Sequence, residues 1–373
     1  MKRVLFLINN LAGGGAEKVL TTYMKYLKND YDITVQTIFN EGVYVDKIQR
    51  MVTYKSIIQK PTLLKKRIIQ RLIKYLPSKL LYKIFVRDKF DCSVAFLEGL
   101  PCKIIAGAPK ETQNLAWIHT DLRNYALKIR GFYSNKSENR CYSNFEKVVC
   151  VSNDVKKAFI EVVKTQEVPI VIYNPVNAKE VQRLSRGKYE GVNRPAKKGF
   201  TCVAVGRLVS LKGFDRLIEA IHRLITEGHE IYLWIIGEGE EKNKLNALIC
   251  QYNLKENIVL MGFQENPYPF IREADLFVLS SHIEGYSLVI AEAFMLGVPV
   301  VSTRCSGPIE LLSNGEYGVL VDNSEEGIYK GIKTVLSNEK LYKELKEKSQ
   351  IRGKQLSAEQ SIAEIKTLIG GEN

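Results

Sequence analysis

The chain has 373 residues, 45% of them hydrophobic and 25% charged, which is typical of globular proteins and argues against a disordered chain. Its length favours two domains, no apolar run reaches the ~18 residues that span a bilayer, and the apolar start at residues 4–8 is shorter than a secretory signal needs. Residues 1–199 carry 36 Lys and Arg against 17 Asp and Glu, whereas residues 200–373 carry 18 against 24, so an anionic surface is expected to face the first half only.

Short strands rich in Val, Ile and Leu alternate with longer amphipathic stretches along the chain, which predicts parallel sheets covered by helices. In the first half the predicted strands lie near 3–8, 33–39, 92–97, 114–118, 147–151 and 170–172. In the second half they lie near 200–205, 231–236, 258–260, 275–279, 298–302 and 318–321. The predicted fold class is therefore α/β, with two doubly wound Rossmann-like domains that face each other and bind ligands in a shared cleft at the carboxyl ends of their strands.

A polar, basic stretch at 177–199 is predicted to be the linker between the domains. It separates an N-terminal domain at 1–176 from a C-terminal domain at 200–356, and the segment 357–373 is a candidate to cross back to the N-terminal domain. The seven cysteines are scattered without a Cys-x-x-Cys pair and are expected to be buried free thiols.

The stretch LINNLAGGGAEKVL, residues 7–20, places three glycines between a strand and a helix. Gly14 and Gly15 offer free amides at a helix start and room for a phosphate to approach. A dinucleotide fingerprint needs a third glycine where Lys18 stands, and an ATP-type loop would end in Gly-Lys-Ser/Thr. The loop therefore indicates a phosphate site but not an NAD or ATP site.

Residues 60–89 form the most basic stretch of the chain, with ten Lys and Arg and one acid, Asp88. Leu64, Ile68 and Leu72 recur at four-residue spacing, which predicts a basic amphipathic helix, and a second begins after Pro77. This pattern favours binding to an anionic membrane surface. The alternative is a helix whose apolar stripe packs on the core. Nucleic acid is disfavoured because no known nucleic-acid motif accompanies the patch.

Two polar residues follow predicted strands of the first half. His119, in LAWIHTDL, and Glu98, in FLEGLP, both come just after a strand and are expected at the ligand-binding edge. Glu98 is a candidate acceptor contact. The other three histidines, His222, His229 and His282, have no such context and are expected to be structural or exposed.

No metal site is expected. The single Asp-x-Asp triplet, Asp30-Tyr31-Asp32, precedes a strand rather than following one and is typical of a polar turn. The His and Cys residues have no zinc spacing.

The second half carries a candidate diphosphate site. Arg207 and Lys212 lie in the loop between a buried strand and a helix, where two cations can hold a diphosphate and neutralise it as it leaves. Further on, Glu284 and Gly285 precede a helix predicted from about Ser287 to Leu296. The amides of its first turn are unsatisfied donors. Glu292 lies within this helix, and carboxylates can accept hydrogen bonds from sugar hydroxyls and from a ribose diol. The alternative is that Glu284 caps the helix and Glu292 is merely exposed.

Together these stretches resemble the retaining glycosyltransferases of family 4, which have the two-domain GT-B fold. The resemblance covers nearly the whole chain and rests, in order, on GGGAEKV, WIHTD, VSNDV, YNPV, VGRL with LKG, IIGEGEE, and two glutamates separated by seven residues. It implies a transferase that takes a hexose or N-acetylhexosamine from a nucleotide-diphosphate sugar, most commonly UDP-linked. It also implies a front-face mechanism that retains the anomeric configuration, with no cofactor and no metal.

The resemblance also assigns roles to residues. Arg207 and Lys212 would hold the donor diphosphate, Glu284 and His119 would contact the transferred sugar, and Glu292 would bind the ribose. The expected catalytic set is Arg207, Lys212, Glu284 and His119. The donor would also contact Gly14, Gly15, Gly285, Tyr286, Ser287, Leu288 and Val289. Candidate sugar or acceptor contacts are Glu98 and the CSGPIELL loop with Ser306, Gly307 and Glu310, where many relatives have two adjacent glycines.

The hypothesis is therefore a glycosyltransferase that acts on a lipid-linked or saccharide acceptor in surface polysaccharide or glycolipid assembly. It would be cytoplasmic and peripherally bound to the inner face of the cell membrane. The alternatives are a non-catalytic partner that keeps the fold and binds a nucleotide sugar, and an NAD-dependent dehydrogenase, which Lys18 disfavours. The sequence does not identify the sugar, the acceptor or the linkage.

Overall fold

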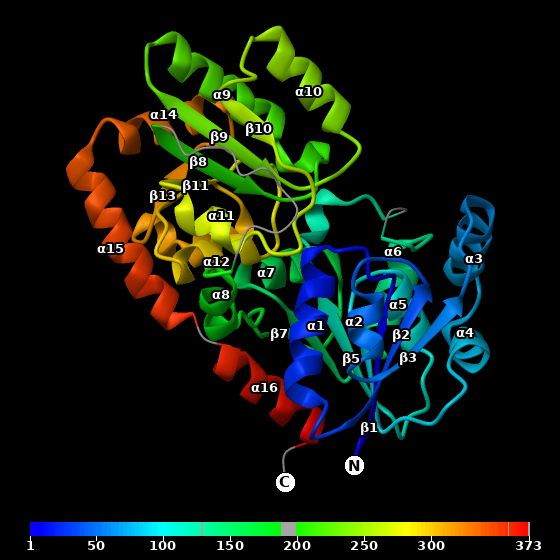
Figure 1. The fold of residues 1–373 in the computed structure, drawn as a ribbon. Coiled ribbons are helices and arrows are strands. Elements are labelled where there is room, and N and C mark those ends of the chain that lie inside the picture. The colour runs from blue at the N-terminus through cyan, green and yellow to red at the C-terminus, as the bar shows by residue number, and fades with distance from the viewer. Residues whose placement is uncertain (128–129, 188–198, 357, 372–373) are drawn as a thin grey trace. The chain divides into compact units, whose positions relative to one another are not determined.

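The computed structural model describes residues 1–127, 130–187, 199–356 and 358–371. The chain divides into two compact units (Figure 1): the first comprises Met1–Pro175 with Ala358–Asn373, and the second comprises Val176–Ser357. Each unit is built around one parallel sheet with helices, as the alternation of strands and amphipathic stretches predicted.

The sheet of the first unit has seven strands in the order β3-β2-β1-β4-β5-β6-β7, all paired in parallel. The strands are β1 (Arg3–Ile8), β2 (Asp32–Phe39), β3 (Thr53–Ile58), β4 (Cys92–Ala95), β5 (Gln113–Ile118), β6 (Lys147–Cys150) and β7 (Ile170–Val171). Six of them lie where the sequence predicted a strand. The edge strand β3 was missed because its sequence, TYKSII, is partly exposed and holds few of the apolar residues that mark the central strands.

The helices of the first unit are α1 (Gly15–Leu27), α2 (Val45–Gln49), α3 (Leu63–Tyr75), α4 (Ser78–Phe85), α5 (Leu100–Ile105), α6 (Asn135–Tyr142), α7 (Asn153–Val162) and α16 (Ala358–Gly370), with a short 3₁₀ helix at Leu122–Asn124. Helix α16 comes from the far end of the chain and packs against α1. The Lys2 ammonium donates to the carbonyl of Ile369 (2.5 Å), and the Tyr31 hydroxyl donates to that of Lys366 (3.2 Å). The segment after residue 357 thus completes the first unit.

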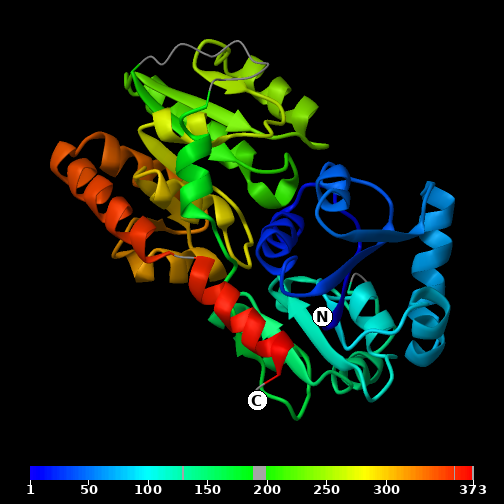
Figure 2. The ribbon, with the colours of Figure 1, turned by 60° about the horizontal axis from the view of Figure 1, so that its bottom comes forward.

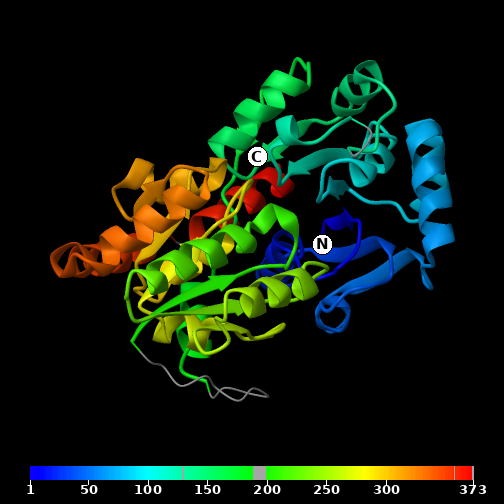
Figure 3. The same cartoon turned by 90° about the horizontal axis from the view of Figure 1, so that it is seen from above.

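Helices α3 and α4 follow one another at one side of this sheet (Figures 2 and 3), where Gln36 of β2 donates to the carbonyl of Phe85 (2.8 Å). The apolar stripe predicted for residues 60–89 is only partly used for packing. Ile73 and Leu81 are fully buried, whereas Leu64 is 68% exposed and Ile68 is 49% exposed. Packing on the core therefore does not account for the whole stripe.

The sheet of the second unit has six strands in the order β10-β9-β8-β11-β12-β13, again all parallel. The strands are β8 (Phe200–Val205), β9 (Ile231–Ile236), β10 (Ile258–Leu260), β11 (Leu276–Leu279), β12 (Val300–Thr303) and β13 (Val319–Val321), all within a residue or two of the predicted positions. The helices are α8 (Ala178–Leu184), α9 (Phe214–Thr226), α10 (Lys242–Gln251), α11 (Tyr268–Glu273), α12 (Leu288–Met295), α13 (Ser306–Leu311), α14 (Glu325–Leu336) and α15 (Glu339–Gln355), with 3₁₀ turns at Ser210–Lys212 and Ser313–Gly315.

The stretch predicted as a linker, 177–199, begins with a helix instead. The Asn177 side chain accepts a hydrogen bond from the amide of Glu180 (2.9 Å) and so caps α8. Val181 of this helix is buried, and Asn266 donates to the carbonyl of Leu184 (3.0 Å), so α8 belongs to the second unit. Residues 188–198 of the predicted linker lie outside the described part of the chain.

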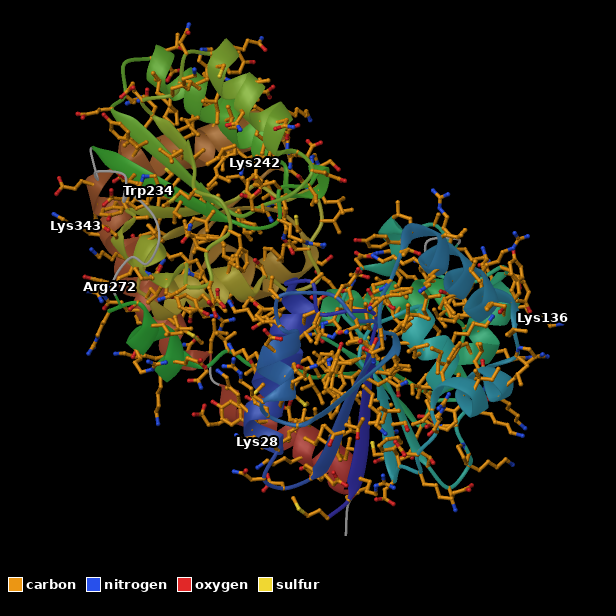
Figure 4. The ribbon with its side chains drawn as sticks, turned by 45° about the vertical axis from the view of Figure 1, so that its right-hand side comes forward. Lys28, Lys136, Trp234, Lys242, Arg272 and Lys343 are labelled. Carbon is orange, nitrogen blue, oxygen red and sulfur yellow. The ribbon has the colours of Figure 1, made fainter. Side chains whose placement is uncertain are left out.

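Side chains divide between core and surface as the sequence pattern requires. Trp234 of β9 is buried, whereas Lys28 after α1 and Lys136 of α6 are exposed (Figure 4). All seven cysteines are free thiols, six of them buried and Cys250 exposed. Among the described residues, no helix is long and apolar enough to cross a membrane.

Candidate functional site

In the second sheet, the direction in which successive strands are added reverses between the neighbouring strands β8 and β11. From β8 the order runs outward through β9 and β10, and from β11 it runs the other way through β12 and β13. In open parallel sheets, ligands bind outside the carboxyl ends of the strands at such a switch point. The loop after β8 carries Arg207 and Lys212, and the loop after β11 carries Glu284. The topology thus brings the predicted cations and carboxylate to one edge.

Lys212 and Glu284 form an ion pair across this switch point. The Lys212 ammonium donates to Oε1 of Glu284, and the hydroxyl of Ser281 donates to the same oxygen at 2.8 Å. The Lys212 side chain is 23% exposed and that of Glu284 is 12% exposed. A carboxylate that is held at one oxygen and partly shielded from water keeps its orientation. It can therefore present the other oxygen to a ligand.

The two loops are also joined by their backbones. The amide of His282 donates to the carbonyl of Leu211, and the hydroxyl of Ser280 donates to that of Lys212, both at 2.8 Å. Arg216 of α9 adds a third link, since its Nη2 donates to the carbonyl of Ser280 at 2.6 Å. These bonds fix the position of the Lys212–Glu284 pair before any ligand arrives.

Helix α12 begins directly after this loop. Its N-cap is Ser287, whose side chain makes no capping hydrogen bond. The hydrogen bonds of the Glu284 carboxylate go to Lys212 and Ser281. Tyr286, Leu288 and Val289 lie with Ser287 around the first turn of the helix, where backbone amides point out of the N-terminus.

The loop after β12 closes against this helix start. Its helix α13 includes Ser306, Gly307 and Glu310, and the amide of Gly307 faces the carbonyl of Glu284 at 3.5 Å. A Cβ at position 307 would lie 2.6 Å from the carbonyl oxygen of Gly285, so only glycine permits this approach. Glu310 lies near the end of α13, and its carbonyl accepts from Arg352 of α15 (3.2 Å).

Glu292 lies one turn into α12 and is 1% exposed, which contradicts the alternative that it is merely exposed. The hydroxyl of Tyr268, at the start of α11, donates to Oε1 of Glu292 at 3.2 Å. Among the described residues, no hydrogen bond links Glu292 directly to the Lys212–Glu284 pair.

Arg207 is exposed, as a residue that receives a ligand from solvent would be.

The first unit has its own switch point, between β1 and β4. The loop after β1 leads into α1, with Gly14 as the N-cap and Gly15 as the first residue, and Gly13 before them has a φ of +98° that favours glycine. The loop after β4 carries Glu98, and the loop after the neighbouring strand β5 carries His119. All four predicted residues of this unit thus follow strands at the carboxyl edge of its sheet.

His119 is 9% exposed, and its ring packs against that of Phe96 with centroids 5.0 Å apart. Burial lowers the pKa of His119 to about 3, so the imidazole is neutral at physiological pH. Its Nε2 atom is buried and has no hydrogen-bond partner among the described residues. A buried ring nitrogen without a hydrogen-bond partner is unusual.

The carboxylate of Glu98, the candidate acceptor contact, is held by two hydrogen bonds from the neighbouring loop. Oε2 of its carboxylate accepts from the amide of His119 (2.9 Å), and Oε1 accepts from the hydroxyl of Thr120 (2.7 Å). Both oxygens are therefore engaged within the protein.

Sequence reasoning missed three residues that support the site. Ser281 orients Glu284, Tyr268 contacts Glu292, and Thr120 contacts Glu98. The position of Ser281, just after a strand and three residues before a glutamate, was a usable signal. The contact between Tyr268 and Glu292 spans 24 residues and had none.

The Asp-x-Asp triplet lies elsewhere and is engaged in structural contacts. Asp30 pairs with Lys366 of α16 (2.6 Å), and Asp32 pairs with Arg3 of β1 (3.6 Å). Within the described ranges, no group of three or more His, Cys, Asp or Glu residues is placed to hold a metal ion.

Comparison with known proteins identifies the family. Residues 185–352 match the sequence model of the family described as "Glycosyl transferases group 1". The lipopolysaccharide core biosynthesis glycosyltransferase LpsE of Rhizobium meliloti (strain 1021) is 30% identical over 251 residues, which cover 66% of this chain and 69% of LpsE. The chain belongs to the group 1 glycosyltransferases.

A second relative matches about half of this glycosyltransferase. It is the N-acetylgalactosamine-N,N'-diacetylbacillosaminyl-diphospho-undecaprenol 4-alpha-N-acetylgalactosaminyltransferase of Campylobacter jejuni, 36% identical over 186 residues, or 49% of this chain and 48% of that protein. Among solved structures, HepE from Anabaena in complex with UDP-glucose has a TM-score of 0.78 at 18% identity, with 99% of this chain and 100% of that chain covered. The glycosyltransferase therefore has the GT-B fold that the sequence resemblance implied.

Proposed function

We propose that this glycosyltransferase is a retaining enzyme of family 4 that transfers a hexose or N-acetylhexosamine from a UDP-linked donor. The acceptor would be a lipid-linked or saccharide molecule at the cytoplasmic face of the membrane. The observation that carries the proposal is the Lys212–Glu284 pair, held at the switch point of the second sheet beside the start of α12.

The diphosphate of the donor would bind at the cations of this edge. Arg207 is exposed, and Lys212 lies in the same loop beside Glu284, so both can pair with an anion at this edge. The first turn of α12 adds backbone amides, which favour a phosphate through hydrogen bonds and the helix dipole. The cations and amides would neutralise the diphosphate without a divalent metal. UDP and UDP-glucose complexes among the structural neighbours support a uridine donor.

The sugar would lie against Glu284, which orients it through hydroxyl hydrogen bonds. In the proposed front-face reaction the bond from the anomeric carbon to the diphosphate oxygen breaks. The acceptor oxygen then bonds to that carbon on the same face. The acceptor proton passes to the leaving diphosphate oxygen, whose charge Lys212 and Arg207 stabilise. His119, neutral because it is buried, would hydrogen-bond a sugar hydroxyl through its imidazole.

The acceptor assignment rests on the relatives and on the surface of α3 and α4. One relative is named for lipopolysaccharide core biosynthesis and another for transfer to a diphospho-undecaprenol. In this chain, exposed Leu64 and Ile68 lie on α3 among Lys65, Arg67 and Arg71. Such a surface fits the headgroup region of an anionic membrane, where a lipid-linked acceptor would be found.

The competing function is a non-catalytic partner that only binds a nucleotide sugar. The ordered Lys212–Glu284 pair, with Ser281 as a third member, favours the enzyme because it places a cation beside the carboxylate, where the cation can stabilise a leaving diphosphate. A transferase commonly hydrolyses its donor slowly, whereas a binder does not.

The test is to incubate the protein with UDP-glucose, UDP-galactose, UDP-N-acetylglucosamine and UDP-N-acetylgalactosamine and to measure both thermal stabilisation and released sugar. We expect one donor to raise the melting temperature and to be hydrolysed. Lys212→Ala should abolish most of both effects, whereas Lys346→Ala, which removes an exposed lysine of α15, should change neither. Stabilisation without hydrolysis or transfer would favour the binding partner, and no response to any donor would overturn the proposal.

A further inference from the structure

Glu98 and His119 follow neighbouring strands of the first sheet. β4 and β5 pair in parallel with Ala95 beside Ala116, so the loops after them leave the same edge of the sheet side by side. Gly99, directly after Glu98, has a φ of +84°, and a Cβ there would lie 2.8 Å from the carbonyl oxygen of Arg130. The backbone directly after Glu98 therefore takes a conformation that requires glycine at position 99.

The carboxylate of Glu98 is engaged at both oxygens by the His119–Thr120 turn. Oε2 accepts from the amide of His119 at 2.9 Å and Oε1 accepts from the hydroxyl of Thr120 at 2.7 Å. Hydrogen bonds to a charged acceptor are about twice as strong as neutral ones. Burial raises the pKa of Glu98 while these two bonds lower it, so the bonds offset part of the cost of a partly buried charge.

The turn held in this way determines where the imidazole of His119 lies. No described hydrogen bond reaches Nε2 of the ring, which is positioned by its backbone and by packing against Phe96 at 5.0 Å. A shift of the backbone at residues 119 and 120 would therefore move Nε2 directly. Displacing a group by about 1 Å can cost about 100-fold in rate.

We propose that Glu98 is a positioning residue that fixes the His119–Thr120 turn, so that the imidazole of His119 meets the transferred sugar. The inference rests on the proposed function for the contact between His119 and the sugar. It assigns to Glu98 a role different from an acceptor contact, since both of its oxygens are already used within the protein.

The first test compares two substitutions of Glu98. Glu98→Ala removes both hydrogen bonds and should lower kcat at least tenfold with little change in the KM of the acceptor. Glu98→Gln keeps an oxygen for the amide of His119, and its NH₂ group can donate to the Thr120 hydroxyl, which rotates to accept. It should therefore retain most of the activity. A glutamine variant as impaired as the alanine variant, or a raised acceptor KM, would indicate direct contact with the acceptor and overturn the proposal.

A double-mutant cycle tests whether Glu98 acts through His119. In a His119→Ala background, Glu98→Ala should change the rate by less than about twofold because its target is gone. A full additive loss would overturn the proposal. If Glu98→Ala fails to fold, Thr120→Val, which removes one of the two bonds, takes its place in the cycle.

The second readout does not depend on activity. The chain has four histidines, so the NMR spectrum of imidazole-labelled protein is simple, and His119→Ala assigns the signal. Glu98→Ala should shift the His119 signal and leave those of His222 and His229 in place, whereas Glu98→Gln should shift it little. An unmoved His119 signal in Glu98→Ala would overturn the proposal even if transfer is confirmed. If no donor is turned over by the unaltered protein, the proposed function fails, and the NMR result still decides whether Glu98 holds the turn.

Discussion

Replacing Leu64 and Ile68 by serine should release the protein from anionic membranes. The two side chains are 68% and 49% exposed, so the surface that they could bury in a bilayer is already free of the core. Full burial of a leucine or isoleucine contributes about 1.5–3 kcal/mol, which, scaled by the exposed fractions, gives about 2 kcal/mol for the pair. We therefore expect roughly a 30-fold weaker partition into vesicles, because each 1.4 kcal/mol corresponds to about tenfold.

The charges on the same helix provide a second, independent perturbation. Replacing Lys65, Arg67 and Arg71 by serine should cost roughly 1 kcal/mol for each charge near an anionic surface, and the loss should shrink as salt is added. Lys66 is left unchanged because it pairs with Glu41 at 2.6 Å, and its removal would expose a new negative charge.

Sedimentation with phosphatidylglycerol-containing vesicles, with phosphatidylcholine vesicles as reference, measures both effects. The matched control replaces Lys340, Lys346 and Lys354, three exposed lysines of α15 in the second unit, and should leave binding unchanged. If the α3 variants sediment like the unaltered protein, the surface of α3 does not bind membranes. If the α15 control lost vesicle binding to the same extent as the α3 charge variant, net charge alone would explain the effect of the α3 charges.

Two further predictions concern the reaction, and a third concerns the pH dependence of stability. Lys212→Ala and Arg207→Ala should each lower turnover about 100-fold or more, the usual scale for losing a preorganised charge stabiliser, whereas EDTA should have no effect; inhibition by EDTA that manganese reverses would disprove the metal-free mechanism. NMR of the product should show the anomeric configuration of the donor, and Glu284→Gln should slow transfer without trapping a sugar on the protein; an inverted product or a glycosylated Glu284 in mass spectra would contradict the front-face route. The pKa of His119 is lowered to about 3 from an ordinary 6.5. Between these two pH values His119 binds a proton in the unfolded chain but not in the folded one. The free energy of unfolding should therefore decrease as pH falls from 6.5 toward 3. His119→Asn should flatten the dependence of melting temperature on pH in that window, and an unchanged slope would show that His119 is protonated in the folded state.

The fold could be predicted because its strands are short, buried and apolar. β9 reads IYLWII and β1 reads RVLFLI, and a parallel strand covered on both faces needs such a run. The strand β3 and the helix α8 lack that signal. β3 lies at a sheet edge and is partly exposed, and α8 is a polar helix whose Asn177 cap was present in the sequence but was read as part of a linker.

The site could be predicted only as far as each residue has a position relative to its own strand or helix. Arg207, Lys212 and Glu284 follow strands, so their common edge could be inferred from the sheet rule. Which side chains touch depends on rotamers and loop paths that local pattern does not encode. The contact of Glu98 with His119, 21 residues away, is an example, and the positioning role proposed for Glu98 rests on it.

Because α16 belongs to the first unit, the second unit is an insertion within it, and the chain crosses between the units near residues 175 and 357. During synthesis the first unit therefore lacks its last helix until all of the second has been made. Lys2, Tyr31 and Asp30 cannot form their contacts with α16 until then, because their partners lie more than 330 positions away in the sequence. Domains usually fold in order from the N-terminus as the chain emerges. All seven strands of the first sheet lie before residue 172, so this sheet can form before the second unit is made. The surface of α1 that α16 covers nevertheless stays exposed until α16 has been synthesised and docks.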